Sequence, residues 1–180
     1  MEKKLPLNKH GKQLWTRELA RQIRVSVEET LEELQPGDTC VIDAKGVEVF
    51  DYSFANELFG KTILSLPHEY PERFLIVENL TKYTSENLSK ALESMGLMMI
   101  ERQKGTLRLI GKVHPTDQET FSAIVRTKRP VTAVELKDKL GVNLNAMNER
   151  LTKLAGLALI RRQRSVSQAG REQYAYSVLV

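Results

Sequence analysis

Two short apolar runs, each lying between helical patterns, set the strongest limit on how the N-terminal part of this chain folds. The runs, Thr39–Asp43 and Phe74–Val77, are short and rich in β-branched or aromatic residues, so we expect buried strands. Apolar residues recur at three- or four-residue spacing around them, which predicts helices at about residues 17–35, 53–66 and 85–95. Strands that alternate with helices predict an α/β domain with a mainly parallel or mixed sheet.

Three further features complete this expected domain. The stretch Lys3–Trp15 alternates apolar and basic residues and predicts a short hairpin or an irregular arm. Thr16 is the expected N-cap of the first helix, and Pro67 and Pro71 are expected to close the second. After the third helix, residues 97–110 predict a hairpin of two strands.

A different order of elements follows His114-Pro115, which we expect to form a linker. Thr116 and Glu119 have the spacing of a capping box at the start of a first helix, and Thr132 is the expected N-cap of a second helix at residues 133–140. A tight turn, a third helix at residues 144–157 and two strands at residues 159–164 and 174–180 are expected next. One face of the third helix is apolar and consists of Leu144, Met147, Leu151 and Leu154.

The charge of the chain also changes near this point. Residues 1–113 carry 16 Lys and Arg against 17 Asp and Glu, a net charge of −1, whereas residues 114–180 carry 11 against 6, a net charge of +5. This asymmetry predicts two domains, at residues 1–113 and 114–180, with different partners. Nucleic acid is a candidate partner for the basic domain, and an ordinary solvated surface explains the charge equally well.

Composition excludes several classes of protein. Cys40 is the single cysteine, so a disulfide framework and a multi-cysteine zinc site are excluded. The sequence contains no run of about 18 apolar residues, so no membrane-spanning helix is expected. The N-terminus leads into no apolar segment of the kind found in secretory signals. We therefore expect a cytoplasmic protein that has no membrane partner.

The sequence contains no pattern typical of an enzyme. His10, His68 and His114 are scattered, and none has a partner at the spacing of metal ligands. No Gly-rich phosphate loop and no serine with a general-base signature occur. We therefore expect no catalytic residues, no metal site and no cofactor.

Residues 10–112 resemble a known family. The segments that carry the resemblance are Thr16-Arg17-x-x-Ala20-Arg21, then Val41-Ile-Asp43-x-x-Gly-Val47 and Asp51-x-Ser-Phe-Ala-x-Glu-Leu58. They look like the STAS-like domain, first described as a domain of unknown function and related to the STAS domains of anti-sigma-factor antagonists. The resemblance implies an α/β domain that contacts a protein partner and takes part in signalling.

The same resemblance singles out Asp51 and Ser53 as a phosphorylation or partner-binding loop. In anti-sigma-factor antagonists an Asp-Ser-Ser-Gly loop stands at this helix start, and an ATPase related to histidine kinases phosphorylates the second serine. Ser53 matches that serine, while Tyr52 and Phe54 replace the neighbouring Ser and Gly. Ser53 is also the expected N-cap of its helix. Both roles remain open for Ser53, because a helix N-terminus also favours a phosphate.

Residues 116–180 resemble bacterial winged helix-turn-helix domains. The resemblance rests on Val134-x-Leu136-x-x-x-Leu140-Gly-Val, followed by Met147-x-x-x-Leu151-x-x-Leu154-x-x-x-Ala158-Leu-Ile160. Gly141 frees the backbone for the sharp turn, and Ala158 stands where the family often has Gly. The resemblance implies that the third helix enters the DNA major groove and that the wing contacts flanking DNA.

The positions that match the DNA contacts of this family form two groups. The groove-facing positions of the third helix are Asn143, Asn145, Asn148, Glu149 and Thr152, with Arg150 and Lys153 expected to reach phosphates. The phosphate clamp on the wing consists of Arg161, Arg162, Arg164 and Arg171. An Asn amide can pair with adenine through two hydrogen bonds, whereas Glu149 is acidic where a basic residue is common.

Together these features predict a cytoplasmic bacterial DNA-binding protein that regulates transcription. Its STAS-like domain would sense a signal or a protein partner, for which the resemblance suggests a histidine-kinase-like ATPase. The alternative is a protein-interaction adaptor with no nucleic-acid function, whose winged helix mediates protein contacts or dimerisation. A homodimer is compatible with both, and salt-dependent binding to duplex DNA separates them.

Overall fold

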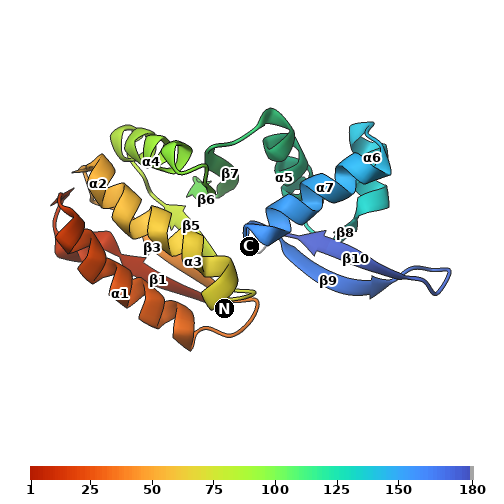
Figure 1. The fold of residues 1–180 in the computed structure, drawn as a ribbon, viewed down its shortest axis with the longest axis horizontal. Helices are drawn as coiled ribbons and strands as arrows, with labels where there is room; N and C mark the ends of the chain where they lie inside the picture. The colour runs from red at the N-terminus through yellow and green to blue at the C-terminus, as the bar shows by residue number, and fades with distance from the viewer. Residues whose placement is uncertain (179–180) are drawn as a thin grey trace. The chain divides into compact units, whose positions relative to one another are not determined.

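The structure is a computed structural model that describes residues 1–178 and divides the chain into two compact units, Met1–Val113 and His114–Val180 (Figure 1). Each unit has its own sheet and its own buried apolar residues. Within the part of the chain that the structure describes, no helix is both long enough and apolar enough to cross a membrane.

A five-stranded sheet forms the centre of the N-terminal unit, in the order β1-β3-β5-β6-β7. The strands β1 (Glu2–Pro6), β3 (Thr39–Asp43), β5 (Phe74–Glu78) and β6 (Met98–Gln103) are parallel neighbours. The last strand, β7 (Thr106–Gly111), pairs antiparallel with β6, which confirms the predicted hairpin. The unit therefore has a mixed α/β fold with a mostly parallel sheet, as the alternation of strands and helices predicts.

The N-terminal arm forms neither a hairpin nor an irregular segment, so the prediction for residues 3–15 is wrong. Strand β1 instead pairs in parallel with β3, with Lys4 opposite Val41. The 3-10 helix η1 (Leu7–His10) follows, and then β2 (Gln13–Leu14) pairs in parallel with β4 (Val49–Phe50). A parallel pair joins segments that are far apart in the sequence, so local alternation does not reveal it.

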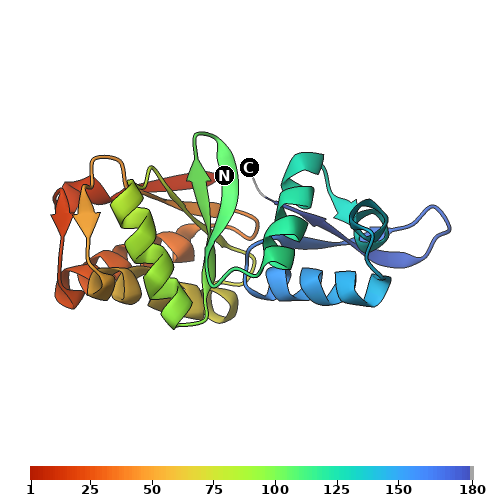
Figure 2. The same ribbon diagram turned by 90° about the horizontal axis from the view of Figure 1, so that it is seen from above.

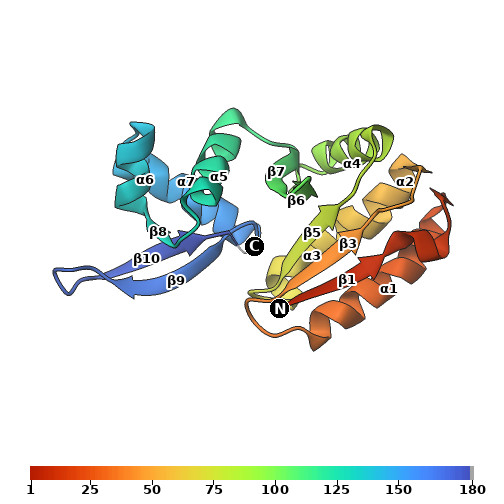
Figure 3. The ribbon, with the colours of Figure 1, turned by 180° about the vertical axis from the view of Figure 1, so that it is seen from behind.

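The helices of this unit lie on one face of the sheet (Figures 1 and 3). The first, α1 (Arg17–Glu33), begins after Thr16, whose hydroxyl accepts a hydrogen bond from the Leu19 N–H at 3.3 Å, as predicted. Its buried positions are Ala20, Ile23, Val27, Thr30 and Leu31. The last, α4 (Lys82–Ser94), begins three residues earlier than predicted because Thr81 and Thr84 form a capping box.

One helical stretch runs between these two helices in three parts: α2 (Tyr52–Ala55), the π-helical turn η2 (Asn56–Gly60) and α3 (Lys61–Glu69). The prediction that Pro67 closes this helix is wrong, since Pro67 lies inside α3. A proline lacks the backbone N–H that a helix normally uses, and the helix ends two residues later, at Glu69. The loss of this bond therefore affects only the last turn of α3.

Three helices and a three-stranded antiparallel sheet in the order β8-β10-β9 make up the C-terminal unit (Figure 2). In chain order the elements are α5 (Pro115–Thr127), β8 (Val131–Thr132), α6 (Ala133–Leu140), α7 (Leu144–Gly156), β9 (Arg161–Val166) and β10 (Glu172–Ser177). The fully buried side chains between them include Phe121, Leu136, Met147, Leu151 and Leu154.

The start of α5 differs from the prediction. His114, not Thr116, is the N-cap: its ring Nδ1 accepts a hydrogen bond from the Thr116 N–H at 3.3 Å. Pro115 is the first residue of the helix, so His114-Pro115 begins α5 and is not a linker. A proline suits this position because the first helical N–H has no intrahelical partner to lose.

The later elements of this unit follow the predictions more closely. Thr132 is confirmed as the N-cap of α6, and it forms a capping box with Glu135. Leu144 is 38% exposed and does not belong to the buried face of α7. Of the strand expected at residues 174–180, the structure places residues up to 177 in β10, and residues 179–180 lie outside the described part.

Candidate nucleic-acid interface

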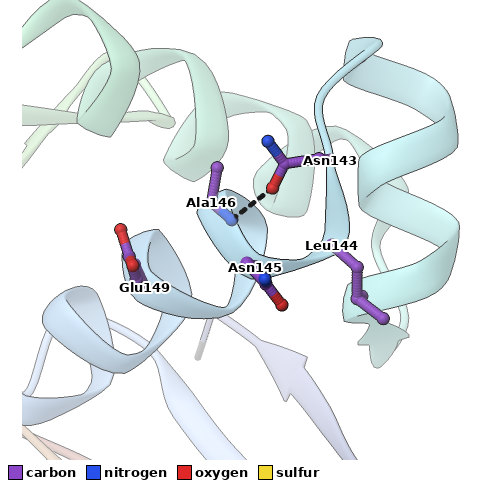
Figure 4. Close-up of a pocket in the computed structure, with 5 residues that line it drawn as sticks. All are labelled: Asn143, Leu144, Asn145, Ala146 and Glu149. Atoms are coloured by element: carbon purple, nitrogen blue, oxygen red, sulfur yellow. Dashed lines mark hydrogen bonds between the residues drawn. The ribbon is translucent and has the colours of Figure 1, made fainter.

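Gly141 and Asn143 set the turn between α6 and α7. Gly141 has the left-handed backbone angle φ of 66°, and its N–H bonds the Lys137 carbonyl as the C-cap of α6. Asn143 is the N-cap of α7, and its side-chain oxygen accepts a hydrogen bond from the Ala146 N–H at 2.8 Å (Figure 4). The oxygen of Asn143 is therefore used by the helix, and only its amide NH₂ group is left for a ligand.

Four polar side chains lie on the exposed face of α7: Asn145, Asn148, Glu149 and Thr152. A shallow hollow of about 470 Å³ at the start of the helix is lined by Asn143, Leu144, Asn145, Ala146 and Glu149 (Figure 4). Within residues 1–178 the side chains of Asn145 and Asn148 make no hydrogen bond. Their amides are therefore free to bind another molecule.

The two basic residues of α7 are bound to α5. Arg150 donates to Glu119 Oε2 at 3.1 Å, and the exposed fraction of its side chain is 18%. Lys153 donates to Asp117 Oδ2 at 2.6 Å. Because each of these two cations already neutralises a carboxylate of α5, neither is free to contact a phosphate. The structure therefore does not confirm the phosphate contacts predicted for Arg150 and Lys153.

The basic residues on the hairpin of β9 and β10, unlike those of α7, are not paired with a carboxylate within residues 1–178. Arg162 and Arg164 are exposed on one face of β9, and Arg161 is half-buried on the other. The Arg162 guanidinium lies 3.9 Å from the centre of the Tyr174 ring, which is a cation–π contact. Arg171 is exposed next to the turn, where its backbone N–H donates to Ser167 Oγ at 3.0 Å.

The ion pairs of this unit are all outside the hairpin, among the residues that the structure describes. They join Arg129 to Glu135, Lys137 to Asp138, Arg150 to Glu119 and Lys153 to Asp117. Arg161, Arg162, Arg164 and Arg171 have no acidic partner in this part of the chain. Unpaired arginines of this kind can take up phosphates without first breaking an ion pair.

A second hollow, of about 230 Å³, lies between α7 and β10. Apolar side chains contribute to its lining, among them Val134, Leu144 and Tyr174, which are respectively 48%, 38% and 40% exposed. Asn148 also lines it, so the amide face of α7 continues into the face of the hairpin that carries Tyr174.

The loop at Asp51 and Ser53, predicted to be a phosphorylation or partner-binding loop, differs from the prediction in one respect. Asp51, not Ser53, is the N-cap of α2, and its carboxylate accepts a hydrogen bond from the Phe54 N–H at 2.7 Å. Ser53 is the second residue of the helix and is half-buried. Its hydroxyl makes no hydrogen bond within residues 1–178. The sequence contained the signal for this cap, since Asp is as good an N-cap residue as Ser.

One charged cluster beside this loop was not predicted. The Glu57 carboxylate on η2 is 1% exposed and lies 2.6 Å from Lys61, 3.6 Å from Arg24 and 3.7 Å from Arg21. Burial acts to raise the pKa of Glu57, but the three cations together hold it below its ordinary value. Glu57 is one turn after Ser53, and its ion pairs join the π-helical turn to α1.

Neither unit shows an arrangement for metal or thiol chemistry among the described residues. No group of three or more His, Cys, Asp or Glu side chains could hold a metal ion. Cys40 is buried in β3, and burial raises the pKa of its thiol to about 12. A thiol with so high a pKa is a poor nucleophile.

Comparisons with known proteins support the N-terminal resemblance. Residues 20–84 match the family model described as "STAS-like domain of unknown function (DUF4325)", so this segment is similar to that family. No curated protein sequence matches the chain. A solved structure described as "Possible transcriptional regulator from Methanosarcina mazei Go1" is similar at 14% identity and a TM-score of 0.35. That match covers 38% of this chain and 57% of that one, so the chain spans little more than half of that protein's length.

Proposed function

We propose that this protein binds duplex DNA through its C-terminal unit and that its STAS-like unit connects this binding to a protein signal. The observation that carries the proposal is which basic side chains are ion-paired and which are not. Those on the hairpin have no acidic partner within residues 1–178, whereas Arg150 and Lys153 on α7 are paired with α5. The phosphate contacts of this proposal therefore come from the hairpin.

The order of elements supports a winged helix-turn-helix function for this unit. The pair α6 and α7 is joined by the Gly141 turn, and the antiparallel hairpin follows directly. In this arrangement α7 would enter the major groove with its exposed amides, and the hairpin would lie on the flanking backbone. We propose no catalytic reaction for either unit.

The STAS-like unit would receive its signal at the start of α2. Ser53 lies in the first turn of this helix, where backbone N–H groups and the helix dipole favour a phosphate. We propose a histidine-kinase-like ATPase as the partner and Ser53 as its target. Incubation of the chain with such an ATPase and ATP, followed by mass spectrometry of the peptide that contains Ser53, tests this assignment.

One observation favours the alternative of a protein-interaction adaptor. Val134, Leu144 and Tyr174 are exposed around the second hollow, and exposed apolar side chains that gather in one place are typical of protein contact sites. In that case the arginines of the hairpin would stay in solvent and duplex DNA would not bind.

Binding of the full chain to a fluorescent duplex at low salt separates the two functions. The variant Arg162→Ala/Arg164→Ala should bind every duplex more weakly than wild type, because both lost side chains contact the backbone. The matched control is Lys90→Ala/Lys104→Ala, which removes the same charge from exposed positions of the other unit. Equal affinities of the two variants would contradict the proposal, and no binding by the wild type would favour the adaptor.

A further inference from the structure

We infer that the C-terminal unit selects A·T base pairs, and that α7 and the hairpin do so through different grooves. This inference rests on the proposed function, since it concerns the DNA sequence that the same surface binds. It has two independent parts: the hydrogen-bonding groups that α7 leaves free, and the charge state of the hairpin.

The free groups on α7 match adenine. A side-chain amide offers one acceptor and one donor side by side, which fit the N6 amino group and the N7 atom of adenine in the major groove. Asn145 and Asn148 are exposed, and their amides have no hydrogen-bond partner within residues 1–178. Asn143 lacks this capacity because its oxygen already accepts the Ala146 N–H.

The same helix has no free group that suits guanine. Guanine presents two acceptors, O6 and N7, and is usually read by Arg or Lys. Arg150 and Lys153 are bound to Glu119 and Asp117 and lie toward α5. The exposed carboxylate of Glu149 is itself an acceptor, so it can accept a hydrogen bond from the N6 amino group of adenine or the N4 amino group of cytosine, but it would face the O6 and N7 acceptors of guanine unfavourably. The exposed face of α7 therefore favours adenine and disfavours guanine.

The hairpin also favours A·T pairs, but through the minor groove. Arg171, next to the turn of the hairpin, is exposed and has no ion pair in the described part of the chain. Runs of A·T pairs have a narrow minor groove with an enhanced negative potential, which attracts arginine side chains. A guanine in that groove would add its N2 amino group and obstruct the insertion of an arginine.

The first experiment measures base preference: the full chain is used to select bound duplexes from a random-sequence pool. We expect A·T pairs at two neighbouring positions contacted by α7 and at the flanking positions of the hairpin. A single change from A·T to G·C under Asn145 or Asn148 should lower affinity by roughly 5- to 150-fold, the discrimination of one bidentate pair. The double variant Asn145→Ala/Asn148→Ala should lose this discrimination, whereas the control Gln22→Ala, an exposed amide on α1, should keep it.

Inosine·cytosine pairs then separate the two grooves, because they resemble G·C in the major groove and A·T in the minor groove. Replacement of A·T by I·C should lower affinity at the α7 positions and leave it nearly unchanged at the hairpin positions. Selection of G·C pairs, or an A·T preference that survives in the double variant, would overturn the inference. Binding without any base preference would overturn the inference and leave the proposed function standing, whereas absence of binding at low salt would overturn both.

Discussion

At the scale of single residues, Asp51 holds the first turn of α2 through the hydrogen bond that its carboxylate accepts from Phe54. The change Asp51→Ala removes this cap and should lower the free energy of unfolding by about 1 kcal/mol. Ser53→Ala should cost much less, since its hydroxyl has no hydrogen bond within residues 1–178. Urea unfolding of both variants measures the difference, with Asp51→Asn as a control that retains a capping oxygen. A larger loss for Ser53→Ala would contradict this assignment.

Glu57 makes the stability of the N-terminal unit depend on pH. Because its pKa is lower in the folded protein than the ordinary value of 4.5, its contribution is fully present above pH 4.5. The contribution is lost as the pH falls through the lowered folded-state value. The variant Glu57→Gln leaves three cations around a neutral side chain and should be less stable than wild type at neutral pH.

The free energies of unfolding of wild type and Glu57→Gln should therefore converge as the pH is lowered from neutral to well below 4.5. Urea unfolding at a series of pH values checks this. The control is Glu29→Gln, an exposed glutamate of α1. A constant difference between wild type and Glu57→Gln over the whole series would show that the Glu57 charge does not matter.

At the scale of elements, the proposed DNA binding predicts that α5 competes with DNA for the cations of α7. Asp117 and Glu119 bind Lys153 and Arg150, so the double variant Asp117→Asn/Glu119→Gln releases both cations and removes two negative charges. Its affinity for duplex DNA at low salt should rise, and its salt dependence should become steeper. Buried Asp117 also binds the N-terminal end of α5, so stability should fall. Fluorescence anisotropy titrations compare the variant with wild type, and an unchanged affinity would contradict this competition.

Most helices and strands were predictable because their signals are local. The strands β3 and β5 follow from short apolar runs, and α1, α6 and α7 follow from apolar periodicity with a capping residue in front. The family model that matches residues 20–84 bears out the resemblance for that segment. These features depend on residues within a few positions of one another, which a single sequence displays.

The features that were missed depend on contacts between distant segments. The parallel pairing of β1 with β3 and the ion pair of Arg150 with Glu119 join residues that lie far apart in the chain. The burial of Glu57 among cations of α1 and α3 is of the same kind. The caps at Asp51 and His114 were missed for a local reason: two candidate residues lie close together, and only the backbone shows which one precedes the helix.

At the scale of the whole molecule, the two compact units predict that the two proposed activities can be separated. The fragments 1–113 and 114–180 should each fold alone, with helical circular dichroism and a cooperative thermal transition. Fragment 114–180 should keep the affinity for duplex DNA, and fragment 1–113 should show none. Failure of both fragments to fold would contradict the division, and DNA binding by fragment 1–113 would contradict the assignment of activities.

The central claim is that the arginines of the hairpin hold the phosphate backbone of DNA. The salt dependence of duplex binding by the full chain tests it most directly, measured between about 50 and 200 mM salt. The logarithm of the binding constant should fall linearly with the logarithm of the salt concentration, and the slope for Arg162→Ala/Arg164→Ala should be less steep by about 1.8, or about 0.9 per lost contact. Identical slopes for this variant and wild type would contradict the claim.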